Sequence, residues 1–143
     1  MDGIRAEGLL RLTLVTQKIA RCLAGDAGLT VSEFHCMMQL HLEKPCCVRD
    51  LTAVLGIGAT STSKLLRSLD RKGWIIRTLD DADRRMEIIR LSDAGAGVVQ
   101  RILEAADRAA VSLMEQLPDE RRGPFTECVY TVTRHIKTLS NNN

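Results

Sequence analysis

The sequence IIRTLDDADRRMEIIRL, residues 75–91, decides the fold of this chain. Its two arms, 75–79 and 86–91, are rich in β-branched and aliphatic residues and flank a loop with three aspartates and two arginines. Such arms around Asp-rich turn chemistry predict a β-hairpin. A helix-like run, 60–72, directly precedes it, after a shorter helix and a glycine turn. This order predicts a winged helix-turn-helix, a DNA-binding fold.

The segments outside the hairpin are mainly helical. Apolar residues recur at three- and four-residue steps, which predicts a mainly α fold of six helices with a small β-hairpin wing. We expect one domain over 1–143, with a DNA-binding lobe at about 46–91. The expected helices cover about 4–24, a segment that Pro45 stops, 48–55, 60–72, 94–117 and a last helix within about 118–139. Cys46 and Cys47 are expected in a short strand or extended link.

Several local features predict where helices begin, end and face. Thr30 or Ser32, Thr60 or Ser61, and Ser92 with Asp93 are N-cap candidates. Gly73 is expected just past the end of the helix over 60–72. Since proline breaks a helix interior, we expect the last helix to start at Gly123–Pro124. The expected inward-facing residues of the second and third helices are Phe34, Met37, Met38, Leu42, Leu51, Val54 and Leu55.

Positive charge is concentrated in the middle of the chain. The whole sequence has a formal net charge of +2, whereas residues 44–90 contain ten Lys or Arg against six Asp or Glu, a balance of +4. A basic centre fits a phosphate-binding surface, although an ordinary solvated face would give the same pattern.

The helix over 60–72 divides into two faces. On a period of 3.6 residues, Thr62, Leu65, Leu66 and Leu69 share one face and predict packing on the preceding helices. The other face carries hydroxyls and cations without a bulky apolar group, as a helix in a major groove requires. Ser and Thr can bond base edges or phosphates, and Lys and Arg can reach guanine or the backbone. The candidate DNA contacts are Thr60, Ser61, Ser63, Lys64 and Arg67.

The loop of the hairpin predicts a second DNA contact. Asp83 and Arg85 stand two residues apart, so in an extended loop both project from the same side. The Asp83 carboxylate is then placed to orient the Arg85 guanidinium toward a narrow minor groove. Arg84 would point elsewhere, toward a phosphate. The alternative is a surface ion pair worth about 0 to 1 kcal/mol.

The segment DADRRMEIIRLSDAG, after a helix ending in LDRKGWIIR, resembles the MarR family of bacterial transcriptional regulators. That family's wing motif has the form D-x-R-x(5)-L-[ST]-x-x-G, matched by Asp83, Arg85, Leu91, Ser92 and Gly95. The resemblance covers nearly the whole chain. Three positions depart from the family pattern: Thr52 for a small Ala, Thr62 for an aliphatic residue, and Gly123–Pro124 at the usually continuous start of the last helix.

The resemblance implies a homodimer that binds pseudo-palindromic double-stranded DNA, formed through terminal helices at about 4–24 and 118–139. The apolar stripes Leu12, Val15, Ile19 and Val129, Val132, Ile136 also favour a dimer, which would bury them. The family further implies a repressor released by a small, often phenolic effector or by cysteine oxidation. Near the family's effector site, His35 is the candidate ligand-pocket residue, although a satisfied, partly exposed histidine without a ligand is the commoner case.

Five cysteines keep a redox-sensing regulator open as an alternative. Their odd number and the absence of a CxxC spacing indicate reduced thiols whose default role is to fill space. Cys47 and Cys22 are the redox candidates, since cations lie close to both in sequence.

Other classes of function fit the sequence less well. The chain has no 18-residue apolar run and no secretory-signal pattern, so we expect a cytoplasmic protein without membrane contact. Neither an enzyme nor a metal or cofactor site is expected, because no Cys–His–carboxylate set or convergent group of donors is evident. A winged-helix protein-docking module would be expected to have an uncharged or apolar recognition helix. The helix over 60–72 instead carries Ser63, Lys64 and Arg67.

Overall fold

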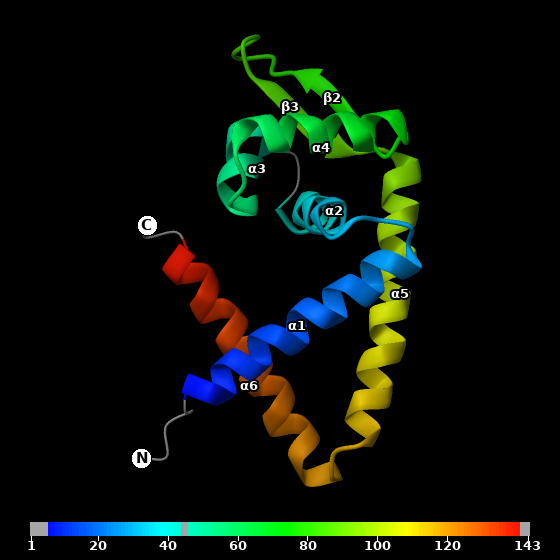
Figure 1. Ribbon diagram of the computed structural model, residues 1–143, viewed down its shortest axis with the longest axis vertical. Helices are drawn as coiled ribbons and strands as arrows, with labels where there is room; N and C mark the ends of the chain where they lie inside the picture. The colour runs from blue at the N-terminus through cyan, green and yellow to red at the C-terminus, as the bar shows by residue number, and fades with distance from the viewer. Residues whose placement is uncertain (1–5, 44–45, 141–143) are drawn as a thin grey trace. The chain divides into compact units, whose positions relative to one another are not determined.

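The computed structural model describes residues 6–43 and 46–140, with side chains at all of these except 6, 9 and 135–140 (Figure 1). Two compact units divide the chain, residues 1–105 and 106–143. The first holds α1 (Ala6–Asp26), α2 (Val31–Glu43), β1 (Cys46–Cys47), α3 (Val48–Leu55), α4 (Ala59–Arg71), β2 (Ile75–Leu79), β3 (Glu87–Leu91) and most of α5 (Asp93–Glu115). The second holds the end of α5 and α6 (Asp119–Ser140). No described helix is both long and apolar enough to cross a membrane.

The wing is part of a three-stranded antiparallel sheet in the order β1-β3-β2. The hairpin pairs Ile75 with Leu91 at its base and Leu79 with Glu87 near its tip. Cys46 pairs with Ile89 and Cys47 with Ile88, so β1 adds a short edge strand. Both the predicted hairpin and the extended conformation at the two cysteines are confirmed, as is the mainly helical winged fold with six helices in the described residues.

The core of the first unit lies where α2, α4, the sheet and the first half of α5 meet. Its buried residues include Cys36, Met37, Leu40, Leu51, Leu66, Leu69, Ile89, Val98, Val99 and Ile102. Two expected core residues are exposed: Leu42 by 69% and Val54 by 59%. Leu42 lies about 140° around its helix from Met37 and so misses the buried row. Val54 lies only about 60° from Leu51, and the helical period does not explain its exposure. Those two predictions were wrong.

Two threonines that depart from the family pattern form a pair inside the helix-turn-helix. The hydroxyls of Thr52 on α3 and Thr62 on α4 lie 3.1 Å apart. Each hydroxyl also lies within hydrogen-bond distance of a backbone carbonyl, that of Val48 at 2.8 Å and that of Gly58 at 3.2 Å, and the two hydroxyl hydrogens make two of these three bonds at a time. Thr62 is completely buried, and these bonds satisfy its hydroxyl. The two substitutions therefore compensate each other as a hydrogen-bonded pair.

The helix ends follow the predicted capping rules in part. Thr30 forms a capping box with Glu33: its hydroxyl accepts from the Glu33 amide at 3.2 Å, and its own amide donates to the Glu33 carboxylate at 2.9 Å. Gly73 takes the left-handed conformation just after α4, with φ of 70°. The N-cap of α4 is Gly58, which makes no side-chain cap bond. Thr60 and Ser61 were wrongly predicted as its caps and lie inside its first turn.

The base of the wing and the start of α5 touch through their backbones. Ser92 caps α5 by accepting from the Gly95 amide at 3.0 Å, and its own hydroxyl donates to the Gly73 carbonyl at 2.6 Å. The Ser92 amide donates to the Trp74 carbonyl at 3.0 Å. A Cβ at Gly95 would lie 2.0 Å from that same carbonyl oxygen. Ser92 and Gly95, the serine and glycine of the L-[ST]-x-x-G motif, thus both take part in the close contact between Trp74 and the start of α5.

In the second unit, α6 begins at Asp119 and includes Pro124, so the predicted start at Gly123–Pro124 was wrong. Arg122 stabilises this earlier start by binding Asp119 at 2.7 Å. Its Nε also donates to the carbonyls of Met114 and Leu117, at 2.9 and 3.2 Å. These bonds offset the backbone hydrogen bond that Pro124 cannot donate. The Pro45 stop and the Ile136 side chain lie outside what the structure describes.

We expect Gly95→Ala to lower the free energy of unfolding by about 1 to 3 kcal/mol, because the new methyl group meets backbone that has little room to move. Urea denaturation followed by circular dichroism measures the change. Gly97→Ala is the matched control on the same helix, since its Cβ meets nothing within 4 Å. The control should raise stability by about 0.5 to 1 kcal/mol, as Gly to Ala does in helices. Equal effects at the two positions would contradict the close contact.

Candidate nucleic-acid interface

The exposed face of α4 carries the predicted hydroxyls and cations. Thr60, Ser61, Ser63, Lys64, Arg67 and Arg71 are all exposed, whereas Thr62, Leu65, Leu66 and Leu69 are buried, as predicted. Lys64, Arg67, Asp70 and Arg71 line a shallow hollow of about 500 Å³ on this helix. Arg67 lies along the helix, with its Nε donating to the Ser63 carbonyl at 3.3 Å. The exposed face of α4 therefore carries three cations, Lys64, Arg67 and Arg71.

The loop of the wing is shaped by aspartate side chains that bind backbone amides. The Asp80 carboxylate accepts from the amides of Ala82 and Asp83, at 2.7 and 3.1 Å. The Asp83 carboxylate accepts from the Arg85 amide at 3.0 Å. Backbone bonds from Met86 to Asp83 and from Asp80 to Met86 close the loop. A short chain segment with exposed Arg84 and Arg85 is thereby held in a defined turn.

The predicted mode of support by Asp83 needs correction. Its carboxylate was expected to orient the Arg85 guanidinium, but it bonds the Arg85 backbone amide instead. Residues 83–85 turn rather than extend, so side chains two apart do not share a side as they would in a strand. Asp83 therefore acts on the path of the backbone, and Arg85 projects from a turn that Asp83 shapes.

Below the loop, an ion pair crosses the hairpin. Arg77 on β2 binds the Glu87 carboxylate through two nitrogens, at 2.8 and 2.7 Å. This bidentate bond raises the pKa of Arg77 above its usual value. Because Glu87 neutralises Arg77, the exposed positive charge of the wing lies with Arg84, Arg85 and Arg90.

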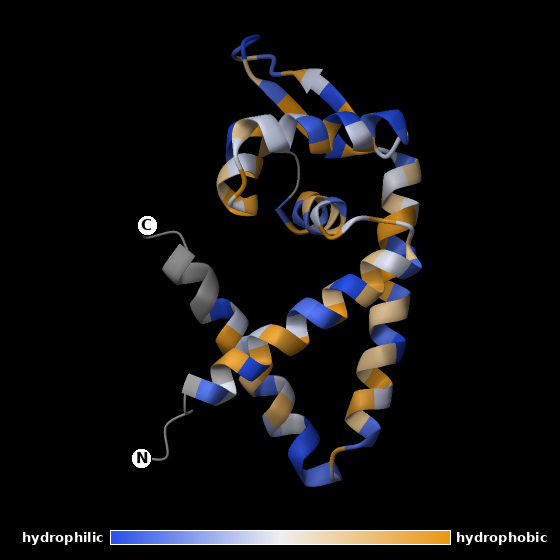
Figure 2. Cartoon of the chain, in the orientation of Figure 1, coloured by the Kyte–Doolittle hydropathy of each residue, from blue (hydrophilic) through white to orange (hydrophobic). Residues whose placement is uncertain are grey.

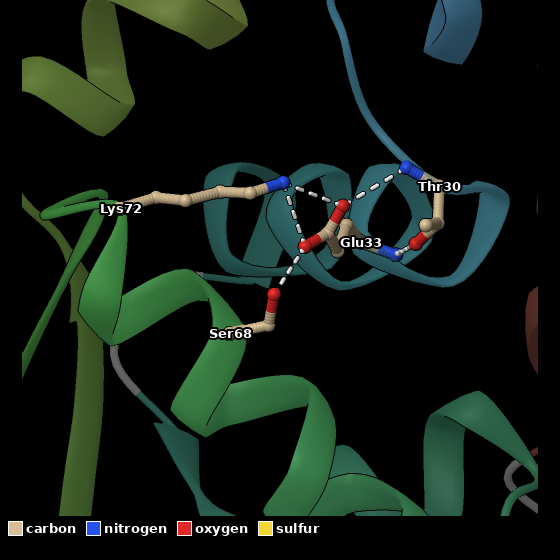
Figure 3. A network of polar contacts seen from close by, with 4 residues as sticks. All are labelled: Thr30, Glu33, Ser68 and Lys72. Carbon is tan, nitrogen blue, oxygen red and sulfur yellow. Dashed lines mark hydrogen bonds and ion pairs between the residues drawn. The ribbon is translucent and has the colours of Figure 1, made fainter.

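A buried carboxylate connects α2 to the end of α4 (Figure 3). Glu33 is only 3% exposed. Its Oε1 accepts from the Ser68 hydroxyl and from Lys72 Nζ, both at 2.8 Å, and its Oε2 accepts from Lys72 Nζ and the Thr30 amide, both at 2.9 Å. Burial raises the pKa of Glu33, but the hydrogen bonds from Lys72, Thr30 and Ser68 outweigh it, so the pKa lies below its usual value of 4.5.

Sequence reasoning missed this network. The pattern T-x-x-E at residues 30–33 is a capping-box signature and could have predicted the Thr30–Glu33 bonds. Nothing in the sequence indicates that Glu33 also meets Lys72, because 39 residues separate them. Only the packing of α2 against α4 brings the two charges together.

His35 lines a second hollow, between α1 and α2. This hollow has a volume of about 440 Å³ and is lined by Thr16, Gln17, Ala20, Arg21, Val31 and His35. The His35 ring is exposed and lies 5.6 Å from the Phe34 ring, centre to centre. Among the described side chains, no three His, Cys, Asp or Glu gather in an arrangement that could hold a metal ion.

The cysteines differ in how readily they could react. The two redox candidates have opposite environments, since Cys22 is exposed and Cys47 is buried. Burial, with smaller contributions from neighbouring negative groups, raises the pKa of the Cys36 thiol to about 12 and that of Cys46 to about 11. Both stay protonated at neutral pH and are poor nucleophiles. Cys128 is exposed on α6.

Comparison with known proteins finds a family that resembles part of the chain. Residues 27–86, which run from the end of α1 to the tip of the wing, match the model of the MarR family. The matched segment is 60 of the 143 residues, and over this segment the chain is similar to the MarR family. It is 26% identical over 80 residues to the uncharacterized HTH-type transcriptional regulator YwhA of Bacillus subtilis (strain 168). That match covers 56% of this chain and 58% of the relative's length.

Solved structures share the fold over most of the chain. Transcriptional regulator Tm0710 from Thermotoga maritima has a TM-score of 0.71 at 20% identity, covering 92% of each chain. A variant of S. aureus MepR bound to an oligodeoxyribonucleotide has a TM-score of 0.64 at 22% identity, covering 91% of this chain and 96% of its own. At these identities the likeness shows the fold, which agrees with the winged helix-turn-helix described above.

The Glu33 network predicts how stability depends on pH. A carboxyl whose pKa is lowered by folding adds stability above its unfolded pKa, near 4.5, and loses that contribution as the pH falls through the folded value. The free energy of unfolding of the wild type should therefore exceed that of Glu33→Gln by a constant amount above about pH 6. This difference should shrink steadily as the pH falls below 4.5. Urea denaturation of both proteins between pH 3 and 7 provides the comparison, and a gap independent of pH would contradict the assignment.

Proposed function

We propose that this chain is a DNA-binding transcriptional regulator that reads a pseudo-palindromic operator as a homodimer. The observation that carries the proposal is the exposed face of α4, with Lys64 and Arg67 beside hydroxyls and no bulky apolar side chain. The wing adds Arg84 and Arg85 on a loop of fixed shape. The recognition helix suits contacts with base edges in the major groove, and the basic hairpin beside it suits contacts with the DNA backbone.

The comparisons support a regulator over an enzyme or a protein-docking module. YwhA and Tm0710 are transcriptional regulators by name, and the MepR variant was solved bound to an oligodeoxyribonucleotide. A docking module would present an apolar or uncharged α4, whereas the exposed face here carries Lys64, Arg67 and Arg71.

Dimer formation through α1 and α6 is supported by apolar side chains that each helix leaves uncovered. On α1, Leu12, Val15 and Ile19 are at least half exposed. On α6, Val129 and Val132 are exposed by 44% and 45%. Hydrophobic residues recur along both helices (Figure 2). Apolar surface on this scale favours burial against a second copy, and a two-fold dimer would present two recognition helices to the two halves of a palindrome.

The regulator is further proposed to be a repressor that responds to a small aromatic or phenolic effector. The hollow between α1 and α2, about 440 Å³, falls in the size range of small-molecule sites. Arg21 and His35 supply a cation and a ring nitrogen that suit a carboxylate or a phenol. Redox control has less support, since the Cys36 and Cys46 thiols have raised pKa values and Cys47 is buried.

The DNA contacts are tested with a duplex selected from a random library by the wild-type protein. Arg85→Ala should weaken binding and reduce the slope of log K against log salt by about one unit for each phosphate that the arginine neutralises. Lys64→Ala should change discrimination at base pairs within the half-site, by about 1 to 3 kcal/mol if the contact is to a base edge. Arg101→Ala removes an exposed arginine on α5 and serves as the control, with little effect on discrimination. If no duplex is enriched over random sequence, the proposed function is wrong.

Two substitutions of Asp83 extend the same binding experiment and separate charge from loop shape. Asp83→Asn keeps an oxygen to accept from the Arg85 amide and removes a negative charge, so it should bind DNA at least as well as the wild type. Asp83→Ala removes the acceptor too and should bind more weakly. Tighter binding by both variants would show that Asp83 opposes DNA only through its charge.

We expect the wild type to have twice the 15.8 kDa mass of one chain in light scattering at micromolar concentration. Val15→Asp or Val132→Asp should shift it toward the monomer, because a charge placed in an apolar interface loses its hydration. Val54→Asp, at an equally exposed valine on α3, is the matched control and should stay dimeric. A wild type that remains monomeric would refute the dimer, and an equal shift in all three variants would refute the assignment to α1 and α6.

A further inference from the structure

Lys72, together with the backbone bonds just after it, holds the end of α4. Its Nζ binds both oxygens of Glu33 on α2. The same Nζ lies 4.7 Å from the centre of the Trp74 ring, at the base of the wing. The backbone amides of Gly73 and Trp74 bond back to Asp70 and Leu69 at 2.8 and 3.0 Å. Lys72 therefore joins α2, the recognition helix and the wing at one point.

Glu33 also holds α4 at two successive turns. Its Oε1 binds Ser68 and Lys72, which are four residues apart and so lie in one row along the helix. The same row continues to Lys64, about 12 Å from Lys72 at the rise of an α-helix. Two anchors in one row restrict rotation of α4 about its own axis and tilt of its end. The anchors at Ser68 and Lys72 thereby fix the direction in which Lys64, at the other end of the row, leaves the helix.

We propose that Glu33 is a positioning residue for DNA binding: it fixes the recognition helix and the base of the wing without contacting DNA itself. This inference rests on the proposed DNA-binding function. Lys72 then serves as the anchor between Glu33 and Trp74 rather than as a phosphate contact. A helix already held in its bound orientation loses less conformational freedom on binding, so the network raises affinity by pre-organisation.

The test variant is Glu33→Gln, which keeps the shape of the side chain and removes its charge. We expect DNA affinity to fall on the order of tenfold, as for substitutions that couple to a site without touching it. The slope of log K against log salt should stay at the wild-type value, because the same phosphates are still neutralised. Fluorescence anisotropy with the selected duplex measures both, at a temperature where circular dichroism shows each variant folded. Glu104→Gln, an exposed glutamate on α5, is the control and should bind as the wild type does.

A double-mutant cycle tests whether Lys72 acts through Glu33. Lys72→Met should weaken binding by a factor similar to Glu33→Gln, and the double variant should be no weaker than either single variant. Should Lys72→Met prove unstable with Glu33 left unpaired, Ser68→Ala probes the second anchor while the ion pair remains. A salt slope reduced by about one in Lys72→Met, together with wild-type affinity in Glu33→Gln, would make Lys72 a phosphate contact and overturn the inference.

Hydrogen exchange without DNA tests the anchoring by Glu33, and the DNA affinities separate this inference from the proposed function. In Glu33→Gln, the amides of Lys72, Gly73 and Trp74 should exchange faster than in the wild type, since the helix end they close is released. If the wild type binds no duplex, the proposed function fails, and the DNA-binding role of Glu33 fails with it. If the wild type binds DNA and Glu33→Gln matches it in affinity, this inference alone fails, whatever the exchange rates.

Discussion

A buried negative charge between α2 and α4 is the constraint on which the arrangement of the DNA-binding elements depends. Glu33 is the one charged residue among the buried side chains that the structure describes. An isolated carboxylate there would be strongly unfavourable, so folding must bring donors to both of its oxygens. Those donors come from Thr30 at the start of α2 and from Ser68 and Lys72 at the end of α4. Any packing of α2 against α4 that separates them leaves the charge unpaired, which selects a single arrangement.

A second constraint lies at Trp74, just after Lys72 in the chain, where the base of the wing contacts the start of α5 through the backbone. The Trp74 carbonyl accepts from the Ser92 amide and lies where a Cβ of residue 95 would be. Since Lys72 packs on the Trp74 ring, the carboxylate of α2 and the glycine of α5 act on the same residue from two sides. The wing is thus joined at its base to two helices, and its loop is shaped separately by Asp80 and Asp83.

The sequence predicted those parts of the structure that depend on neighbouring residues. The buried face of α4 followed from a period of 3.6 residues, and the hairpin from β-branched arms around an Asp-rich loop. The errors have physical causes of the same local kind. Leu42 lies off the buried row of its helix, and Arg122 stabilises a helix start that Pro124 was expected to prevent. The Glu33–Lys72 bond was out of reach, because it depends on how α2 and α4 pack.

Glu33 and Asp83 place two negative charges near a basic surface, where each would repel an approaching phosphate. This repulsion is kept small in a different way for each carboxylate. Glu33 is buried and neutralised by Lys72, so it adds little field at the surface while fixing α4. Asp83 is exposed and screened by water and salt, and its bond to the Arg85 amide shapes the turn that presents Arg85. A cation that is already held in place, as the turn holds Arg85, loses less conformational freedom on binding. It therefore contributes more to recognition than an additional cation that DNA binding must first order.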